Sequence, residues 1–185
     1  MLLQVLFPLL EKVRTRSGAA SSEKMETTGK LLIHHSRNTA QKQWAETQVL
    51  ALSGVSRVFN TKRPTLQQIG DFPRAWALLL EYIEAAALNR NNEVSLAALK
   101  AFTEILNVHR SSLLGPDGTS DKTKGKSCWC TAWEVWLHIG TEATKPPSDE
   151  ELKENSAKEL FVPTQTYLTA LMHIFPLLFS NIREE

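Results

Sequence analysis

A short segment of the chain, from Ser127 to Gly140, concentrates the residue types that could carry out chemistry. Its sequence, SCWCTAWEVWLHIG, holds two cysteines, three tryptophans and one histidine. Cys128 and Cys130 could give two thiolates to a zinc ion, but a structural zinc site needs about four ligands. The chain has no third cysteine, and a redox pair is normally separated by two residues rather than one. No matched pair at the usual ligand spacing exists among the histidines, which are His34, His35, His109, His138 and His173. The segment therefore predicts no metal site and no cofactor.

The same segment is better explained as a helix that packs in a core. Trp129, Trp133 and Trp136 recur at positions i, i+4 and i+7, which lie on one face of a helix. A buried free cysteine such as Cys128 behaves as a small hydrophobic residue. We therefore expect these three tryptophans, together with Trp76 of an earlier helix, to be structural core. An exposed aromatic docking patch is the alternative that stays open.

Other candidate chemical groups are isolated. The side chains of His34 and His35 point in different directions on a helix, and Glu81 and Glu84 are explained as a solvated stripe. The sequence contains no Gly-rich phosphate loop, no GxSxG motif and no HExxH motif. Because no nucleophile, base and orienting group come together, we expect no catalytic residue, no small-molecule substrate and no enzyme activity. An enzyme with a cryptic site is the less favoured alternative.

The composition is that of an ordinary globular chain. Of its 185 residues, 42% are hydrophobic and 22% are charged, and the formal net charge is +1. This balance gives no general attraction for nucleic acid, so we expect no nucleic-acid partner. Two apolar stretches, at 1–14 and 161–179, each contain proline and polar residues. They indicate packing helices rather than a signal peptide or a membrane span.

The elements that must position these residues are helices. Apolar residues recur at helical spacing along most of the chain, and strand patterns are nearly absent. We predict an all-α fold in a single domain over residues 1–185, with an ordered helical core at about 38–142 and a last helix at about 163–182. Polar loops are predicted at about 15–29, 109–127 and 141–160.

Two pairs of predicted helices resemble each other in sequence. EVSLAALKAFTEIL, from Glu93, aligns with ETQVLALSGVSRVF, from Glu46, at an offset of 47 residues. AWEVWLHIG, from Ala132, aligns with AWALLLEYI, from Ala75, at an offset of 57 residues. A period in the forties with two helices per unit is typical of HEAT and armadillo repeats. The order of elements therefore predicts a HEAT/armadillo-like α-solenoid segment of antiparallel helix pairs.

A solenoid of this kind would place alternate connections on opposite edges. The predicted connection at 61–71 and the loop at 109–127 should then share one edge, which carries more basic than acidic side chains. Such an edge would attract an acidic partner or an anionic membrane surface, although solubility alone also explains it. The candidate residues on this edge are Lys62, Arg63, Lys122, Lys124 and Lys126.

Long runs of the sequence closely resemble the Mon-two family of large Golgi and endosome scaffolds, which are related to the large Arf guanine-nucleotide exchange factors. The resemblance rests first on the run from Trp44 to Leu106, which begins WAETQVLALSGVSRVFNTKRP. KLLIHHSRNTAQKQW and CWCTAWEVWLHIG extend it over most of the chain. Since family members are many times longer, the chain is expected to be an internal or C-proximal piece.

The resemblance implies a non-catalytic α-solenoid scaffold in endosome-to-Golgi transport. It implies a cytoplasmic location, peripheral on the membranes of the trans-Golgi network and endosomes. It also implies protein partners, namely Dopey-type proteins and Arf-like GTPases. A regulatory helical fragment of a true Arf exchange factor is the second interpretation that the sequence leaves open.

Overall fold

The computed structural model describes residues 33–107, 122–146 and 161–183, together with Pro8, Glu11, Lys12 and Thr15. Its side chains are described for those four residues and for 40–107, 128–146 and 161–180. The described part of the chain is all-α and contains no strand, as predicted. Its five long helices are α2 (Ile33–Gln67), α3 (Phe72–Ala87), α4 (Asn92–Leu106), α5 (Lys122–Thr144) and α7 (Gln165–Arg183). Most of the predicted first helix and its polar loop lies outside the described residues.

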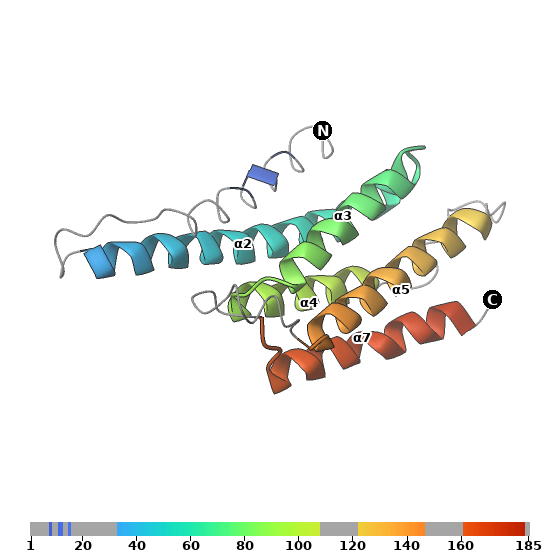
Figure 1. Ribbon diagram of the computed structural model, residues 1–185. Helices are drawn as coiled ribbons and strands as arrows, with labels where there is room; N and C mark the ends of the chain where they lie inside the picture. The colour runs from blue at the N-terminus through green and yellow to red at the C-terminus, as the bar shows by residue number, and fades with distance from the viewer. Residues whose placement is uncertain are drawn as a thin grey trace.

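The helices pack in two rows (Figure 1). Helix α2 packs on α4 and α4 packs on α7, while α3 packs on α5. The rows are joined because α3 also contacts α4, and α5 also contacts α7. Each later helix therefore packs against the described helix two places before it in the chain. A single hydrophobic core extends through all five helices, from Ala45 to Leu178.

Helix α2 is longer than the sequence predicted. The expected connection at 61–71 is wrong, since α2 continues through Pro64 to Gln67 and only residues 68–71 connect it to α3. A proline inside a helix removes one backbone hydrogen bond and is normally unfavourable. Side chains near Pro64 offset this loss, because Asn60 and Arg63 hydrogen-bond to the end of α4.

The other helix boundaries follow local signals. Asp71 precedes α3 and Pro73 lies in its first turn, and the Asp71 side chain makes no capping hydrogen bond. Helix α4 is capped by Asn91. The Asn91 carboxamide oxygen accepts from the backbone N–H groups of Glu93 (2.9 Å) and Val94 (3.2 Å), which satisfies two free donors of the first turn.

Helix α5 begins at Lys122, inside the range that the sequence assigns to a loop. The three lysines at 122, 124 and 126 therefore belong to a helix and not to a connection. The sequence predicted a loop at this first turn because Gly125 and a run of like charges normally indicate an exposed loop. Helix α7 contains Pro176 and lies at one end of its row (Figure 1).

Candidate docking surfaces

Arg63 is buried in the fold, with 1% of its surface exposed. Its Nη2 atom donates hydrogen bonds to Asn60 Oδ1 (2.9 Å) and to the backbone carbonyl of Ile105. Its guanidinium carbon lies 5.1 Å from the ring centre of Phe59 and 5.7 Å from that of Trp76. Burial lowers the pKa of Arg63 to about 10, so the side chain stays charged at neutral pH. The expectation that Arg63 lies on an exposed binding edge is therefore wrong.

The buried Arg63 closes the end of α4. The last carbonyls of a helix lack intrahelical partners and carry partial negative charge. Here the carbonyl of Ile105 accepts from Arg63, and that of Glu104 accepts from Asn60 Nδ2 at 3.0 Å. The guanidinium of Arg63 and the amide of Asn60, both from α2, thus cap the C-terminus of α4.

The same group of side chains also contacts the first part of α5. The indole Nε1 of Trp76 donates to the backbone carbonyl of Cys128 at 3.0 Å. Burial raises the pKa of the Cys128 thiol, and the nearby charge of Arg63 partly opposes that rise. Trp76 of α3 therefore links the end of α2 to the first part of α5, because its ring packs against Arg63 and its indole hydrogen-bonds to Cys128.

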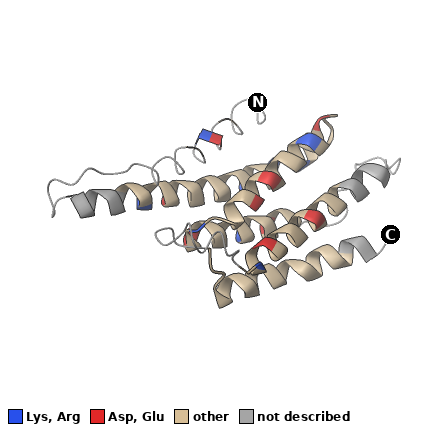
Figure 2. Ribbon diagram, in the orientation of Figure 1, with Lys and Arg blue, Asp and Glu red and all other residues tan. Residues whose placement is uncertain are grey.

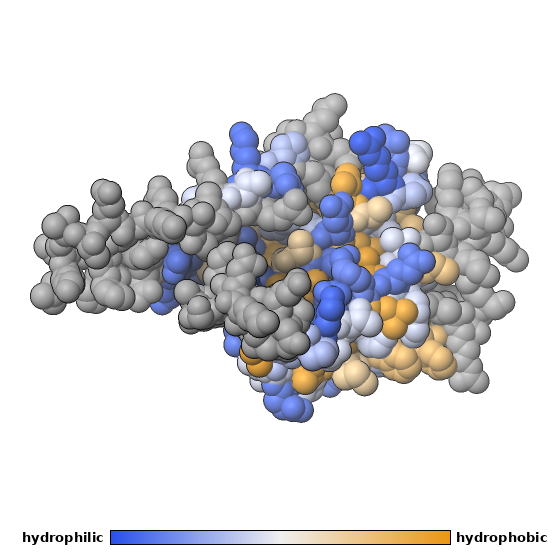
Figure 3. All heavy atoms as spheres, in the orientation of Figure 1, coloured by the Kyte–Doolittle hydropathy of each residue, from blue (hydrophilic) through white to orange (hydrophobic). Residues whose placement is uncertain are grey.

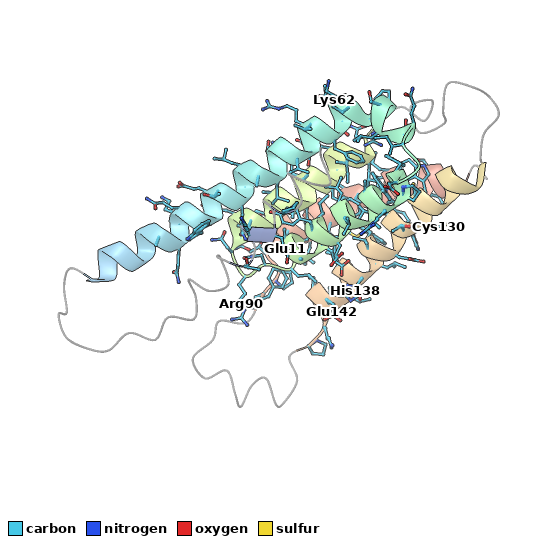
Figure 4. The ribbon with its side chains drawn as sticks, turned by 90° about the horizontal axis from the view of Figure 1, so that it is seen from above. Glu11, Lys62, Arg90, Cys130, His138 and Glu142 are labelled. Atoms are coloured by element: carbon cyan, nitrogen blue, oxygen red, sulfur yellow. The ribbon has the colours of Figure 1, made fainter. Side chains whose placement is uncertain are left out.

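Lys62 is exposed beside this buried group of side chains. It lies one residue before Arg63, near the end of α2, and its side chain extends away from the bundle in Figure 4. The backbone of α5 from Lys122 to Lys126 leads into Cys128, whose carbonyl accepts the hydrogen bond from Trp76 beside Arg63. We call Lys62 and residues 122–126 the basic end; the side chains of Lys122, Lys124 and Lys126 lie outside the described set. Figure 2 shows the described charges scattered over the other helices rather than gathered in one field.

Helices α5 and α7 form an aromatic surface. Trp133 and Trp136 lie 5.3 Å apart, and Phe175 lies 6.0 Å from the first and 5.6 Å from the second, measured between ring centres. Phe179 stacks on Phe175 at 5.4 Å. The indole of Trp136 donates to the Leu171 carbonyl at 2.9 Å, which holds α5 against α7.

This surface is only partly covered. Trp76 and Trp129 are buried, but Trp133 and Trp136 are half-buried. Met172 is 60% exposed, Phe179 is 45% exposed and Leu137, one turn after Trp133, is 43% exposed. Figure 3 shows hydrophobic residues gathered along the lower edge of the molecule, where α7 lies in Figure 1. We define the aromatic surface as Trp133, Trp136, Leu137, Met172, Phe175 and Phe179.

The described residues contain neither a candidate metal site nor a membrane-spanning helix. Cys128 is buried and Cys130 is exposed, and no three histidine, cysteine or acidic side chains gather in the described part in a way that could hold an ion. No helix among the described residues is long and apolar enough to span a bilayer. The side chains of His34 and His35 lie outside the described set.

Comparison with known proteins identifies the family. A family profile described as the C-terminal region of Mon2 protein matches residues 1–125 and 115–185. The chain is 51% identical to Protein MON2 homolog of Drosophila melanogaster and 43% identical to that of Homo sapiens, over 97% of its own length in both cases. Monensin-resistant homolog 2 of Caenorhabditis elegans is 33% identical over the same share.

The chain belongs to the Mon2 family.

The resemblance seen in the sequence is therefore confirmed. The chain spans 11% of the length of the fruit-fly relative and 13% of the human one. It corresponds to the C-terminal region of Mon2 proteins. No solved structure matches the chain.

One polar contact in this Mon2-family chain was missed by sequence reasoning. His138 Nδ1 lies 2.6 Å from Glu84 Oε1 and joins α5 to α3. The sequence placed Glu84 on a solvated stripe, and its local pattern did not show that His138 faces that stripe. His138 is labelled in Figure 4. Arg63 was also misjudged, although it follows Phe59 by four residues and so shares its buried face once α2 is extended.

Proposed function

We propose that this chain is a non-catalytic scaffold segment that mediates protein–protein interactions in Golgi and endosome traffic, within endosome-to-Golgi transport. The observation that carries the proposal is membership of the Mon2 family over 97% of the chain. The location is peripheral, on the cytoplasmic side of trans-Golgi network and endosome membranes. Dopey-type proteins and Arf-like GTPases are the partners that the family suggests.

The packing of the helices supports a scaffold role. Two rows in which each helix rests on the one two places earlier are what a HEAT-like α-solenoid would produce. Such a fold presents long side faces that are not needed for its own core. We propose that the described helices are a segment of such a solenoid and that its faces bind other proteins.

The basic end is the part of this scaffold that we propose for an acidic partner or an anionic membrane surface. Lys62 is exposed, and its neighbour Arg63 packs on Trp76, which hydrogen-bonds to Cys128 just after the lysine-bearing first turns of α5. Lysines at the start of a helix are unfavourable for the helix dipole. An anion bound there would relieve that repulsion, and salt would weaken its binding.

Charge reversal tests this role. Lys62, Lys122, Lys124 and Lys126 are replaced by glutamate, and binding to vesicles containing anionic lipid is measured by co-sedimentation at low and high salt. A control variant reverses four other exposed cations, Lys42, Arg57, Lys100 and Lys145, which lie elsewhere on α2, on α4 and directly after the end of α5. We expect the first variant to lose low-salt binding and the control to keep most of it. Equal losses in both would show that only net charge matters.

Proximity labelling tests the scaffold role itself. The chain, fused to a labelling enzyme, is expressed in cells and the biotinylated proteins are identified. Enrichment of Golgi and endosome traffic proteins over an enzyme-only control is the expected result. An Arf exchange domain found elsewhere in the full-length gene product would favour the alternative, a regulatory fragment of an exchange factor.

A further inference from the structure

One flank of the α5–α7 pair is covered by no described helix. Helix α3 packs on α5 and α4 packs on α7, so the opposite flanks of both helices remain open among the described residues. The aromatic surface lies on those open flanks. Its three most exposed members, Met172, Phe179 and Leu137, are large apolar side chains that would lose water contact on being covered.

The charge pattern indicates what can cover it. The stretch 161–182 contains no aspartate, glutamate, lysine or arginine. Each of the other described helices exposes charged side chains, such as Arg57 on α2, Arg74 on α3, Lys100 on α4 and Glu134 on α5. In a two-fold symmetric pair each face meets its own copy, so a charged face would oppose like charges. The α7 face can pair with itself without that repulsion.

We propose that two copies of the chain associate through the aromatic surface, with α7 of one copy against α7 of the other. The contact would cover Met172 and Phe179 at its centre and Leu137 at its margin. The half-buried indoles and Phe175 form a firm base beneath them, because the Trp136 indole is already hydrogen-bonded to Leu171. This proposal does not depend on the scaffold function or on any Golgi partner.

The size of the surface sets the expected strength. The α7 segment 165–180 is about 24 Å long, and two helices side by side are roughly 20 Å wide. The footprint is then on the order of 480 Å² per partner, against the roughly 800 Å² of a standard stable interface. We therefore expect a weak, reversible dimer with a dissociation constant in the micromolar range or above, rather than a permanent one.

The test is sedimentation velocity on the purified 185-residue chain. Concentrations from about 2 to about 200 µM bracket a micromolar equilibrium. The sedimentation coefficient should rise with concentration, and the rise should persist in 1 M salt (about 3 Å Debye length), because apolar contacts are not screened. Met172→Glu and Phe179→Glu should each keep the chain monomeric over this range. Both side chains are substantially exposed, so the helical circular dichroism spectrum should be unchanged.

Leu50→Glu is the matched control. Leu50 is 73% exposed on α2, and α4 lies between α2 and α7. This variant should therefore associate like the parent. A parent chain that is monomeric at the highest concentration would overturn the proposal and leave the surface to a different protein. The proposal is also overturned if Leu50→Glu abolishes association while Met172→Glu does not, since α2 would then be the contact.

Discussion

Arg63 shows how a single charged residue can hold several helices together. Its one donor atom bonds both Asn60 and the Ile105 carbonyl, and its flat face covers Phe59 and Trp76. A buried charge without these partners would be strongly unfavourable. The residue therefore stabilises the fold only as part of the complete cluster.

Replacing Arg63 should destabilise the protein. Arg63→Ala leaves the Ile105 carbonyl without its donor and opens a space beside two aromatic rings, so we expect a loss of roughly 2–4 kcal/mol in the free energy of unfolding. Arg63→Lys should recover only part of this, because one ammonium group lacks the flat face. Urea denaturation measures both. A midpoint for Arg63→Ala equal to that of the parent would show that the side chain is solvated.

The tryptophans divide into two classes by exposure. Trp76→Ala should lower the free energy of unfolding by about 3–5 kcal/mol, since the ring is buried and its indole hydrogen-bonds to the Cys128 carbonyl. Trp133→Ala should cost less, about 1–2 kcal/mol, because Trp133 is half-buried. The same denaturation experiment compares them. Equal costs would mean that Trp133 is covered as completely as Trp76.

Tyr167 predicts a stability change in alkali. Its buried hydroxyl has no hydrogen-bond partner among the described residues, and burial raises the pKa of Tyr167 to about 12 from the ordinary value of 10.0. The folded state therefore holds this proton more tightly than the unfolded state does. Stability from this group is complete below pH 10 and is lost as the pH rises toward 12.

Tyr167→Phe tests that account. The variant should be as stable as the parent at pH 7, or slightly more stable, because it removes an unsatisfied hydroxyl. Its unfolding free energy should fall less steeply than that of the parent between about pH 10 and pH 12. Parallel pH profiles for the two proteins would show that the hydroxyl titrates normally.

Among the helices, α2 continues through Pro64 although proline normally ends a helix. Pro64 follows Asn60 by four places, so the Asn60 carbonyl has no backbone N–H to accept from. Pro64 is exposed and is not needed for a core contact. Pro64→Ala should restore the bond and raise the free energy of unfolding by about 1–3 kcal/mol. A lower melting temperature for the variant would mean that proline is required by the conformation at this point.

Periodicity predicted helices better than it predicted their ends. The apolar spacing around Trp76 and in 93–106 was enough to predict α3 and α4, because each has a wide apolar stripe. The extension of α2 past Asn60 was missed because Pro64 is a strong local break signal. It is outweighed by contacts to Glu104 and Ile105, which lie more than forty residues away in sequence. Long-range contacts of this kind leave no mark in a local pattern.

At the scale of the whole molecule, the sequence predicted an all-α Mon2-like chain but not its surfaces. Family membership was visible in long unusual runs such as the one from Trp44 to Leu106. The pairing of Glu84 with His138, and the partial exposure of Trp133 and Trp136, depend on how the rows are stacked. A helical wheel shows that a face is apolar, but it does not show whether a neighbour covers it.

We propose that this Mon2-family chain is a scaffold segment whose exposed surfaces bind other macromolecules. Proximity labelling in cells tests it most directly, with the parent chain compared with the basic-end variant. We expect the parent to label Golgi and endosome traffic proteins, and we expect reversal of Lys62, Lys122, Lys124 and Lys126 to reduce this labelling. Labelling of the same proteins by the enzyme alone, with no enrichment by the chain, would contradict it.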